Sequence, residues 1–429
     1  MTHDENNELT GVSPGTPLHR ALSRFWYPLL RSAALADRHT HKARLLGESF
    51  VIARRGATLI AHEEHCPHRQ ASLTLGRVED GGLRCIYHGW LIGDDGSVRE
   101  TPNERESGGR EQVRVRTPQV RDAGGLIWLN ICEHEAERAP FPDLPWMTLP
   151  APQVVIAHAL HGVNWVQALE GAIDSSHTSH LHSDQIVGTA SAGNSTPVGR
   201  GTAQFARPSV DKHPRIRVRD TDFGFVYGAL RKPIKDPESM VYIRATAFAF
   251  PAFVTFPMTP TRGDLQIFVP IDEHHSHFFY VKYSTAEPLD AAALHERSGL
   301  DPEHDVGEDG YLRVASLPMW GQDRAAVAAG QSFTGLKGVS LQDIVVQASM
   351  GPVVDRTREH LGGADVAIVH FRRMLLAAAR GEGAGTADFA KAMQYGGLRA
   401  RDGLLPLDQD WIQIYGEGEI NWREGAEVE

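Results

Sequence analysis

Two short motifs of cysteine and histidine, both in the first quarter of the chain, restrict its possible folds more than any other feature. They are Cys66-Pro-His68 and Cys85-Ile-Tyr-His88, with sixteen residues between them, and they use two of the three cysteines. Each motif is followed by turn-forming or aromatic residues that can fold over a metal ion. We therefore expect two loops that hold one metal centre between them.

Two kinds of metal centre use two thiolates and two imidazoles. In a Rieske 2Fe-2S cluster the thiolates bind one iron and the imidazoles bind the other, and the neutral imidazoles raise the reduction potential. A structural zinc ion is the alternative, but zinc sites of this composition usually begin with two closely spaced cysteines. The motifs favour the 2Fe-2S cluster, with Cys66, His68, Cys85 and His88 as its ligands.

Composition and charge exclude several classes of protein. Hydrophobic residues make up 41% of the chain and charged residues 23%, and no apolar run approaches the roughly 18 residues of a membrane span. The net charge is -11 with dispersed basic residues, which argues against nucleic-acid binding. The small number of cysteines and the polar, acidic start without signal-peptide features predict a cytoplasmic protein. Together with the charge and the short apolar runs, they lead us to expect binding to neither nucleic acid nor membrane.

The length of 429 residues exceeds the usual size of a single core, which predicts two domains. Five prolines between Ala139 and Pro152 oppose both helix and central strand, so we place the boundary there. The first part is rich in hairpin and turn patterns and predicts a small all-β domain. The expected divisions are an N-terminal extension (1–20), a cluster-binding domain (21–138), a linker (139–153) and a second domain (154–429).

The second domain contains separate groups of strand and helix patterns, which is typical of an α+β fold. Alternating and apolar runs predict an antiparallel sheet with strands at 154–161, near 216, and at 223–230, 241–250, 265–269 and 278–283. Helical periodicity predicts helices at 163–176, 342–361 and 365–380.

A second group of metal-binding residue types follows the first of these helices. Asp174, His177, His180 and His182 lie within nine residues. A non-haem Fe(II) oxygenase uses two imidazoles and one carboxylate and leaves other positions open for dioxygen and substrate. Five residues of a helix turn through about 140°, so His177 and His182 can share an iron only if the helix breaks between them. His180, three residues from His177, remains an equal alternative on spacing alone.

The two groups together resemble the Rieske non-haem iron oxygenases, which share C-x-H, C-x-x-H and D-x2-H-x4-H motifs. Asp174, His177 and His182 match the last of these. The resemblance implies that His177 and His182 bind a mononuclear Fe(II), and that Asp174 passes electrons from a Rieske histidine of a neighbouring subunit. It also implies a helix-grip, START-like catalytic domain, in which an antiparallel sheet is flanked by helices.

The resemblance covers nearly the whole chain and is greatest for the phthalate dioxygenase-like group. The segments Leu83–Trp90 and Ser349–Leu361 carry it. In that group the third iron ligand precedes the Ser-Met-Gly-Pro sequence, which implies Asp343. Asp355 is the competing carboxylate, but it lies in an Asp-Arg-Thr-Arg-Glu run that is more typical of an ion-paired surface or interface helix.

The chain has neither a dinucleotide-binding glycine motif after a strand nor a phosphate-binding loop. The resemblance therefore implies a separate NAD(P)H-dependent flavin and iron-sulfur reductase as electron donor, and a head-to-tail homotrimer or hexamer. The implied function is an oxygenase component that uses O2 to hydroxylate, dihydroxylate or O-demethylate an aromatic substrate. A Rieske electron-transfer protein without oxygenase activity is the alternative.

Two arginines in the second domain are candidates for binding a carboxylate of the substrate. Arg244 alternates with apolar residues in a predicted strand, so its side chain can point into the domain. A guanidinium there can hold a carboxylate through two hydrogen bonds. Arg207 is the second candidate, and together they favour a carboxylated aromatic substrate.

Overall fold

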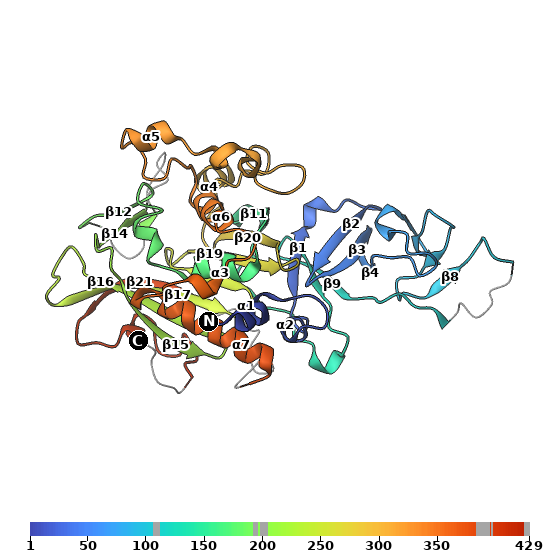
Figure 1. Cartoon of the computed structure of the whole chain (residues 1–429), viewed down its shortest axis with the longest axis horizontal. Helices are drawn as coiled ribbons and strands as arrows, with labels where there is room; N and C mark the ends of the chain where they lie inside the picture. Colours follow the sequence, from blue (N-terminus) through green and yellow to red (C-terminus); the bar gives the residue numbers. More distant parts are fainter. Residues whose placement is uncertain (106–111, 192–195, 198–204, 383–394, 396–397, 424–429) are drawn as a thin grey trace.

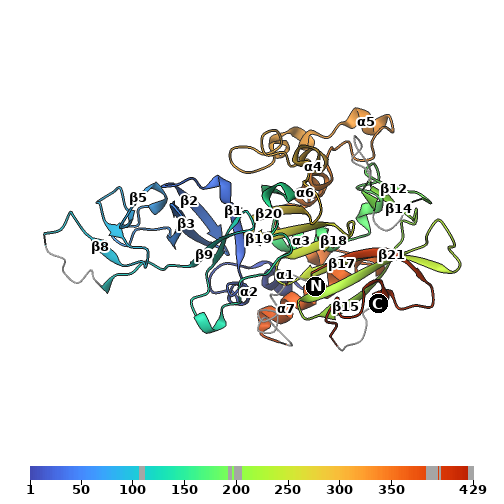
Figure 2. The same cartoon turned by 180° about the vertical axis from the view of Figure 1, so that it is seen from behind.

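The structure is a computed structural model that describes residues 1–105, 112–191, 196–197, 205–382, 395 and 398–423. Figure 1 shows an elongated molecule with a smaller lobe, blue in the figure, and a larger lobe coloured green to red. The N-terminal helices α1 (His3–Thr10) and α2 (Pro17–Leu22) precede the smaller lobe in the chain and contact helix α7 (Val366–Arg380) of the larger lobe. Figure 2 shows the same arrangement from behind.

The smaller lobe consists of short antiparallel strands, as the hairpin and turn patterns predict. They form the sheets β2–β3–β4 (Thr40–Leu45, Glu48–Arg55, Thr58–Glu63), β5–β6–β7–β8 (Arg77–Glu79, Gly82–Arg84, Leu91–Ile92, Val98–Glu100) and β1–β10–β9 (Tyr27–Arg31, Leu126–Asn130, Gln119–Ala123). A small apolar core that includes Cys66 and Cys85 fills the outer end of this lobe. The main core is separate and extends from β1 and β10 into the larger lobe.

One antiparallel sheet forms the centre of the larger lobe, so the expected α+β class is confirmed. The strand order is β11–β20–β19–β18–β17–β16–β15, with β21 (Arg401–Pro406) paired to β17. Strand bounds are β11 Val154–His161, β15 Arg215–Thr221, β16 Gly224–Arg231, β17 Met240–Ala249, β18 Phe253–Phe256, β19 Arg262–Pro270 and β20 Ser276–Ser284. Beside it lies a small sheet of β12 (Ile186–Gly188), β14 (Phe205–Arg207) and β13 (Thr196–Pro197).

Helices cover the sheet and bring the functional residues to it. Helix α3 (Trp165–Ile173) contacts β18, β19 and β20, and it also contacts α6 (Val339–Ser349) and α7. Helices α4 (Ala291–Ser298) and α5 (Arg324–Ala328) belong to the orange segment at the top of Figure 1. In the described part of the chain, no helix has the length and apolar character needed to cross a membrane.

Three of the differences between the structure and the predicted elements concern helix α6 and strands β18 and β21. The helix predicted at 342–361 ends at Ser349, because Gly351 adopts a left-handed backbone with φ 88° and Pro352 follows it. Strands β18 and β21 were not predicted. β18 has only four residues, and β21 contains a glycine, so neither gives a clear alternating pattern.

Candidate active site and cluster site

The two cysteine-histidine loops have matching backbone hydrogen bonds, although their motifs differ in length. The N–H of Cys66 and that of Cys85 each donate to the carbonyl five residues later, at 2.9 Å. The N–H of Gln70 donates to the carbonyl of Cys66 at 2.9 Å, and that of Gly89 to the carbonyl of Cys85 at 3.0 Å. Both donors adopt a left-handed backbone, with φ 60° and 76°. The loops are therefore two copies of one turn.

These turns bring the four predicted cluster ligands together. Both thiols are buried and free of disulfide bonds, and the rings of His68 and His88 lie 4.4 Å apart between centroids. Nδ1 of His68 is buried without a hydrogen-bond partner among the described residues. Burial, together with the adjacent Cys85 thiol, raises the pKa of Cys66 to about 11. A metal centre that ionises both thiols fits this donor set.

The second group of residues begins where α3 ends. Asp174 is the C-cap of α3, and a short 3-10 turn, His177–Ser179, follows it. This interruption is the helix break that the spacing of His177 and His182 required. His182 is 3% exposed, whereas His180 is exposed to solvent. The structure thus brings His177 and His182, but not His180, to one place.

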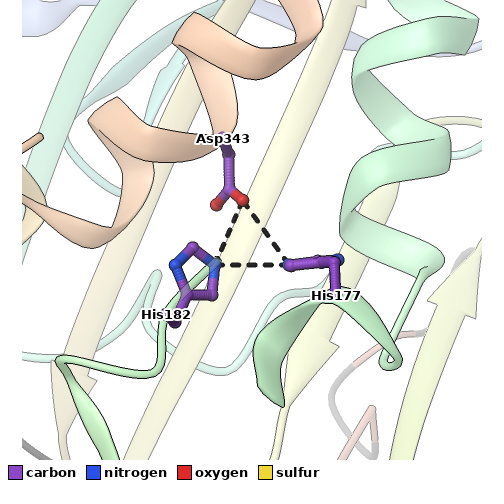
Figure 3. Close-up of side chains that lie close together, drawn as sticks. All are labelled: His177, His182 and Asp343. Atoms are coloured by element: carbon purple, nitrogen blue, oxygen red, sulfur yellow. Dashed lines mark hydrogen bonds and ion pairs between the residues drawn. The ribbon is translucent and has the colours of Figure 1, made fainter. Parts of the chain in front are cut away.

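Helix α6 carries Asp343 to the same place, as Figure 3 shows. Nε2 of His177 lies 3.2 Å from Nε2 of His182, and Oδ1 of Asp343 lies 3.5 and 3.1 Å from these two atoms. One ligand atom from each residue lies within 4.8 Å of the others. Asp355 is exposed and caps a short turn elsewhere. Two imidazoles and one carboxylate at this separation fit a mononuclear iron(II).

Neighbouring side chains fix the direction of both imidazoles. Nδ1 of His182 lies 2.8 Å from Oε1 of Gln342, which is fully buried. Nδ1 of His177 lies 3.3 Å from Asp174. Each Nε2 therefore faces the ligand group. Burial alone would raise the pKa of Asp174, but hydrogen bonds from His177 and Ser176 outweigh it and lower the pKa to about 2.

The distance between α3 and α6 depends on two glutamines. Nε2 of Gln167 donates to the carbonyl of Gln347 at 2.8 Å, and Nε2 of Gln347 donates to the carbonyl of Ala168 at 3.3 Å. A Cβ atom at Gly171 would lie 2.1 Å from Nε2 of Gln347. This close contact fixes α6, and with it Asp343, against the helix that leads to His177.

A buried ion-pair network holds the other side of α3, and no sequence pattern indicates it. Glu170 accepts hydrogen bonds from Arg356 at 3.1 and 3.0 Å and from Arg372 at 2.7 Å. Burial would raise the pKa of Glu170, but Arg356 and then Arg372 lower it. The predicted ion-paired surface or interface stretch is ion-paired at Arg356, but this side chain does not lie on the surface of the chain, because it is 2% exposed and also donates to Asn6 at 3.1 Å.

A cavity opens beside His177, His182 and Asp343, and both predicted arginines line it. Arg244 points inward from β17, as the alternation predicts, and lies over the ring of Phe256 at 5.6 Å. Arg207, at the end of β14, is 8% exposed, and burial followed by the charge of Arg231 lowers its pKa to about 9. The cavity thus joins the ligand group to two guanidinium groups.

Arg231, at the end of β16, is a third cation in this region that sequence reasoning missed. It is 1% exposed, and its Nη2 donates to the carbonyl of Ser175 at 2.8 Å, while Nε and Nη1 have no partner among the described residues. Burial and then Arg244 lower its pKa to about 10. Within the described part of the chain, no carboxylate forms an ion pair with Arg207, Arg231 or Arg244. An anionic ligand would complement these charges.

Comparison with known protein families assigns both lobes. Residues 25–119 match the family described as "Rieske [2Fe-2S] domain", and residues 131–428 match "LigXa C-terminal domain like". The phthalate 4,5-dioxygenase oxygenase subunit of Pseudomonas putida is 36% identical over 88% of this chain and 85% of its own. The 3-chlorobenzoate-3,4-dioxygenase oxygenase subunit of Comamonas testosteroni is 32% identical over 96% of this chain and 97% of its own.

Solved structures have the same fold at low sequence identity. A structure of Pseudomonas putida CBB5 NdmA with caffeine has a TM-score of 0.58 and 16% identity, covering 92% of this chain and all of that one. The reduced complex between oxygenase and ferredoxin in carbazole 1,9a-dioxygenase gives 0.54 and 18%, covering 87% and 90%. These structures share the fold, and the family models and the two relatives show that the chain belongs to the Rieske non-haem iron oxygenases, as an oxygenase component of the phthalate dioxygenase-like group.

Proposed function

We propose that this protein oxygenates a carboxylated aromatic compound in the cavity of the larger lobe. His177, His182 and Asp343 would hold a mononuclear iron(II), and Cys66, His68, Cys85 and His88 would hold the 2Fe-2S cluster. The observation that carries the proposal is the meeting of two imidazoles and one carboxylate, all within 4.8 Å, at the wall of a cavity lined by guanidinium groups. When bound, the iron supplies the activation of dioxygen and the cluster supplies the electrons for it.

The reaction needs one dioxygen molecule, a pair of electrons and a pair of protons for each substrate. In dihydroxylation both oxygen atoms enter the product. In hydroxylation or O-demethylation one oxygen atom enters the substrate and the other leaves as water. The imidazole ligands are held by Gln342 and Asp174, so the chain itself orients the centre before substrate enters. Which of the three reactions occurs depends on the carbon that faces the iron.

Asp174 is proposed to carry electrons toward the mononuclear iron from the cluster of a neighbouring subunit. Its contact with Nδ1 of His177 supports this role, because it connects Asp174 directly to one iron ligand. The arrangement needs a closed, head-to-tail oligomer, which we propose to be a trimer or a hexamer of this chain. A separate electron-transfer protein must supply electrons to the cluster. We propose that this protein is a flavin and iron-sulfur reductase that uses NAD(P)H. A carrier function alone would leave the second ligand group and the cavity without a role.

Arg207 and Arg244 are proposed to bind the carboxylate of the substrate. Both line the cavity, and neither forms an ion pair with a carboxylate in the described residues. Burial favours their pairing with an anion, because a guanidinium removed from water gains most from a charged partner. The names of two relatives, for phthalate and for 3-chlorobenzoate, agree with this class of substrate.

The proposed division of the chain is an extension at 1–20, a cluster domain at 21–138, a linker at 139–153 and a catalytic domain from 154 to the end. The linker segment lies between β10, which ends at Asn130, and β11, which begins at Val154. Residues 424–429 of the last division lie outside the described residues.

A single-turnover experiment tests the proposed function without the reductase. Chemically reduced, iron-replete protein is mixed with 18O-labelled dioxygen and a panel of aromatic acids and methoxylated aromatics, and products are identified by mass spectrometry. We expect a product that contains labelled oxygen or has lost a methyl group, and we expect it to require a carboxylate. Transfer of electrons with no product from any member of the panel would contradict the proposal.

A further inference from the structure

A second polar group lies on the cavity wall, apart from the arginines. Oδ2 of Asp264, on β19, accepts hydrogen bonds from the hydroxyl of Tyr280 at 2.7 Å and from Nζ of Lys282 at 2.9 Å, both on β20. The three residues are buried, with between 4% and 8% of their surface exposed, and Asp264 and Tyr280 line the cavity. This group has no role in the proposed binding of iron or of the carboxylate.

The sheet places this group two strands away from Arg244 on the wall of the cavity. Arg244 is on β17, and the strand order β17–β18–β19–β20 puts β18 between it and Asp264. Phe256 of β18 pairs with Asp264 and also lies under the guanidinium of Arg244. Because neighbouring strands are about 4.8 Å apart, β17 and β19 are about 10 Å apart. A benzene ring with two substituents has a comparable length, so one substrate can contact both groups.

The chemistry of this group selects what it can bind. Asp264 pairs with Nζ of Lys282 at 2.9 Å, and a carboxylate accepts hydrogen bonds and donates none. The hydroxyl proton of Tyr280 is directed to Asp264, so Tyr280 also presents lone pairs to the cavity. Gln266, two residues from Asp264 and also on the cavity wall, can donate or accept. The carboxylate therefore favours a hydrogen-bond donor and opposes a second anion.

Stability does not account for this ion pair. A buried pair of charges loses its hydration, and apolar side chains of similar size usually stabilise a protein equally well or better. The other side chains of β19 and β20 are mostly buried, so an apolar pair would suit the sheet. A function at the cavity surface explains why a charged pair is there.

We infer that Asp264, supported by Tyr280 and Lys282, recognises a hydroxyl or amino substituent on the aromatic ring of the substrate, at the end away from the carboxylate. The inference rests on the proposed carboxylate site and narrows its substrate class to hydroxylated or aminated aromatic acids. Asp264 is a specificity-determining residue in this account. A ring that lacks the donor would leave Asp264 with only Tyr280 and Lys282 as partners and would forgo one hydrogen bond to a charged group, so it should bind less tightly than a ring with the donor.

Anaerobic titration calorimetry on the iron-loaded holoenzyme tests the inference. The probes are benzoate, 3- and 4-hydroxybenzoate, 4-aminobenzoate and 4-fluorobenzoate. We expect at least one of 3-hydroxybenzoate, 4-hydroxybenzoate and 4-aminobenzoate to bind about tenfold more tightly than benzoate and 4-fluorobenzoate, because a hydrogen bond to a charged group has roughly this effect. The double variant D264L/K282M removes both charges, so no unpaired ammonium remains, and it should abolish this preference, so that the hydroxybenzoates and 4-aminobenzoate bind no more tightly than benzoate.

Two further variants separate a binding role from a structural one. Y280F removes one acceptor and should reduce the preference by less than the double variant does. E287Q removes an exposed ion pair with Arg262 at the end of the same strands and should leave the preference unchanged. Thermal unfolding identifies any variant that has lost its fold, and Y280F then provides the test.

The outcomes distinguish the inference from the proposed function. If aromatic acids bind the wild type but show no preference for a donor, or if the preference persists in D264L/K282M, the role of Asp264 is overturned and the carboxylate site stands. If D264L/K282M weakens all acids equally, the group is structural, which also overturns it. If no aromatic acid binds the wild type, both the carboxylate site and the inference fail.

Discussion

The two ligand groups of this protein are assembled in opposite ways. The four proposed cluster ligands lie between residues 66 and 88, on two turns closed by matching local hydrogen bonds. At the cavity, His177 and His182 follow α3, whereas Asp343 comes from α6, 161 residues after His182 (343 minus 182). Local backbone geometry forms the first group, and packing between distant helices forms the second. The two groups should therefore respond differently to substitution.

The largest expected effect is the loss of one site without the other. D343A removes the carboxylate of the trio, so we expect the iron content to fall from about three to about two atoms per chain and oxygenase turnover to be lost. The visible spectrum of the cluster should remain, because its ligands lie on separate turns. C85S should abolish that spectrum and retain binding of one Fe(II). Iron analysis and absorption spectroscopy measure both, and a D343A protein without cluster absorption would contradict the independence of the sites.

The next effect concerns the network around Glu170. E170Q leaves Arg356 and Arg372 without their shared carboxylate, and breaking a buried pair costs about 3–5 kcal/mol. We expect this loss in the free energy of unfolding from urea denaturation, with cluster absorption retained in the folded protein. E8Q is the matched control, because the Glu8–Arg380 pair is partly exposed and contributes at most about 1 kcal/mol. Equal losses in the two variants would contradict the buried character of the network.

The ion pairs of Glu170 with Arg356 and Arg372 make the stability of the protein depend on pH, and the pKa of Glu170 sets the direction of this dependence. Burial raises the pKa of Glu170, but the two arginines outweigh burial and lower it below the ordinary value of 4.5. The network's contribution to stability is therefore full above pH 4.5 and is lost as the pH falls through the lower, folded-state pKa. We expect the stability difference between wild type and E170Q to shrink below pH 4.5, and a difference that grows there would contradict this assignment.

A smaller effect is expected where α3 and α6 touch. The Cβ of G171A would lie 2.1 Å from Nε2 of Gln347, so this side chain must move and its hydrogen bond to the carbonyl of Ala168 is lost, at a cost of about 0.5–1.5 kcal/mol. Because this contact fixes Asp343, we also expect the affinity for Fe(II) to fall about tenfold. G162A is the control, since its Cβ would have no neighbour closer than 4.0 Å. Calorimetric Fe(II) titration distinguishes them, and unchanged affinity in G171A would show that the helix contact does not position the ligand.

The smallest effect lies in the two cluster turns, which differ at one equivalent position. Gln70 adopts a left-handed backbone where Gly89 does so in the second turn. Q70G should therefore stabilise the smaller lobe by about 0.5–1 kcal/mol. G89A should destabilise it, because its Cβ would also meet Pro102 at 2.8 Å. The rate at which the cluster absorption bleaches on heating measures both, and a faster loss in Q70G would contradict the equivalence of the turns.

Sequence alone determined the features that depend on near neighbours. The paired motifs predicted the cluster turns, the apolar alternation predicted most strands of the main sheet, and the spacing of His177 and His182 required the helix break that the structure contains. Hydrogen bonds and steric limits within a few residues decide these features, so a short sequence carries the information.

Only the tertiary structure decided the rest. It leaves His180 in solvent and turns His182 toward Asp343. It buries Arg356 against Glu170, where the local pattern indicated an ion-paired surface or interface stretch. It also gathers Arg207, Arg244 and Asp264 around one cavity from strands that show no shared motif. These arrangements depend on packing between segments far apart in the chain, and the free energy of such contacts leaves no periodic trace in the local sequence.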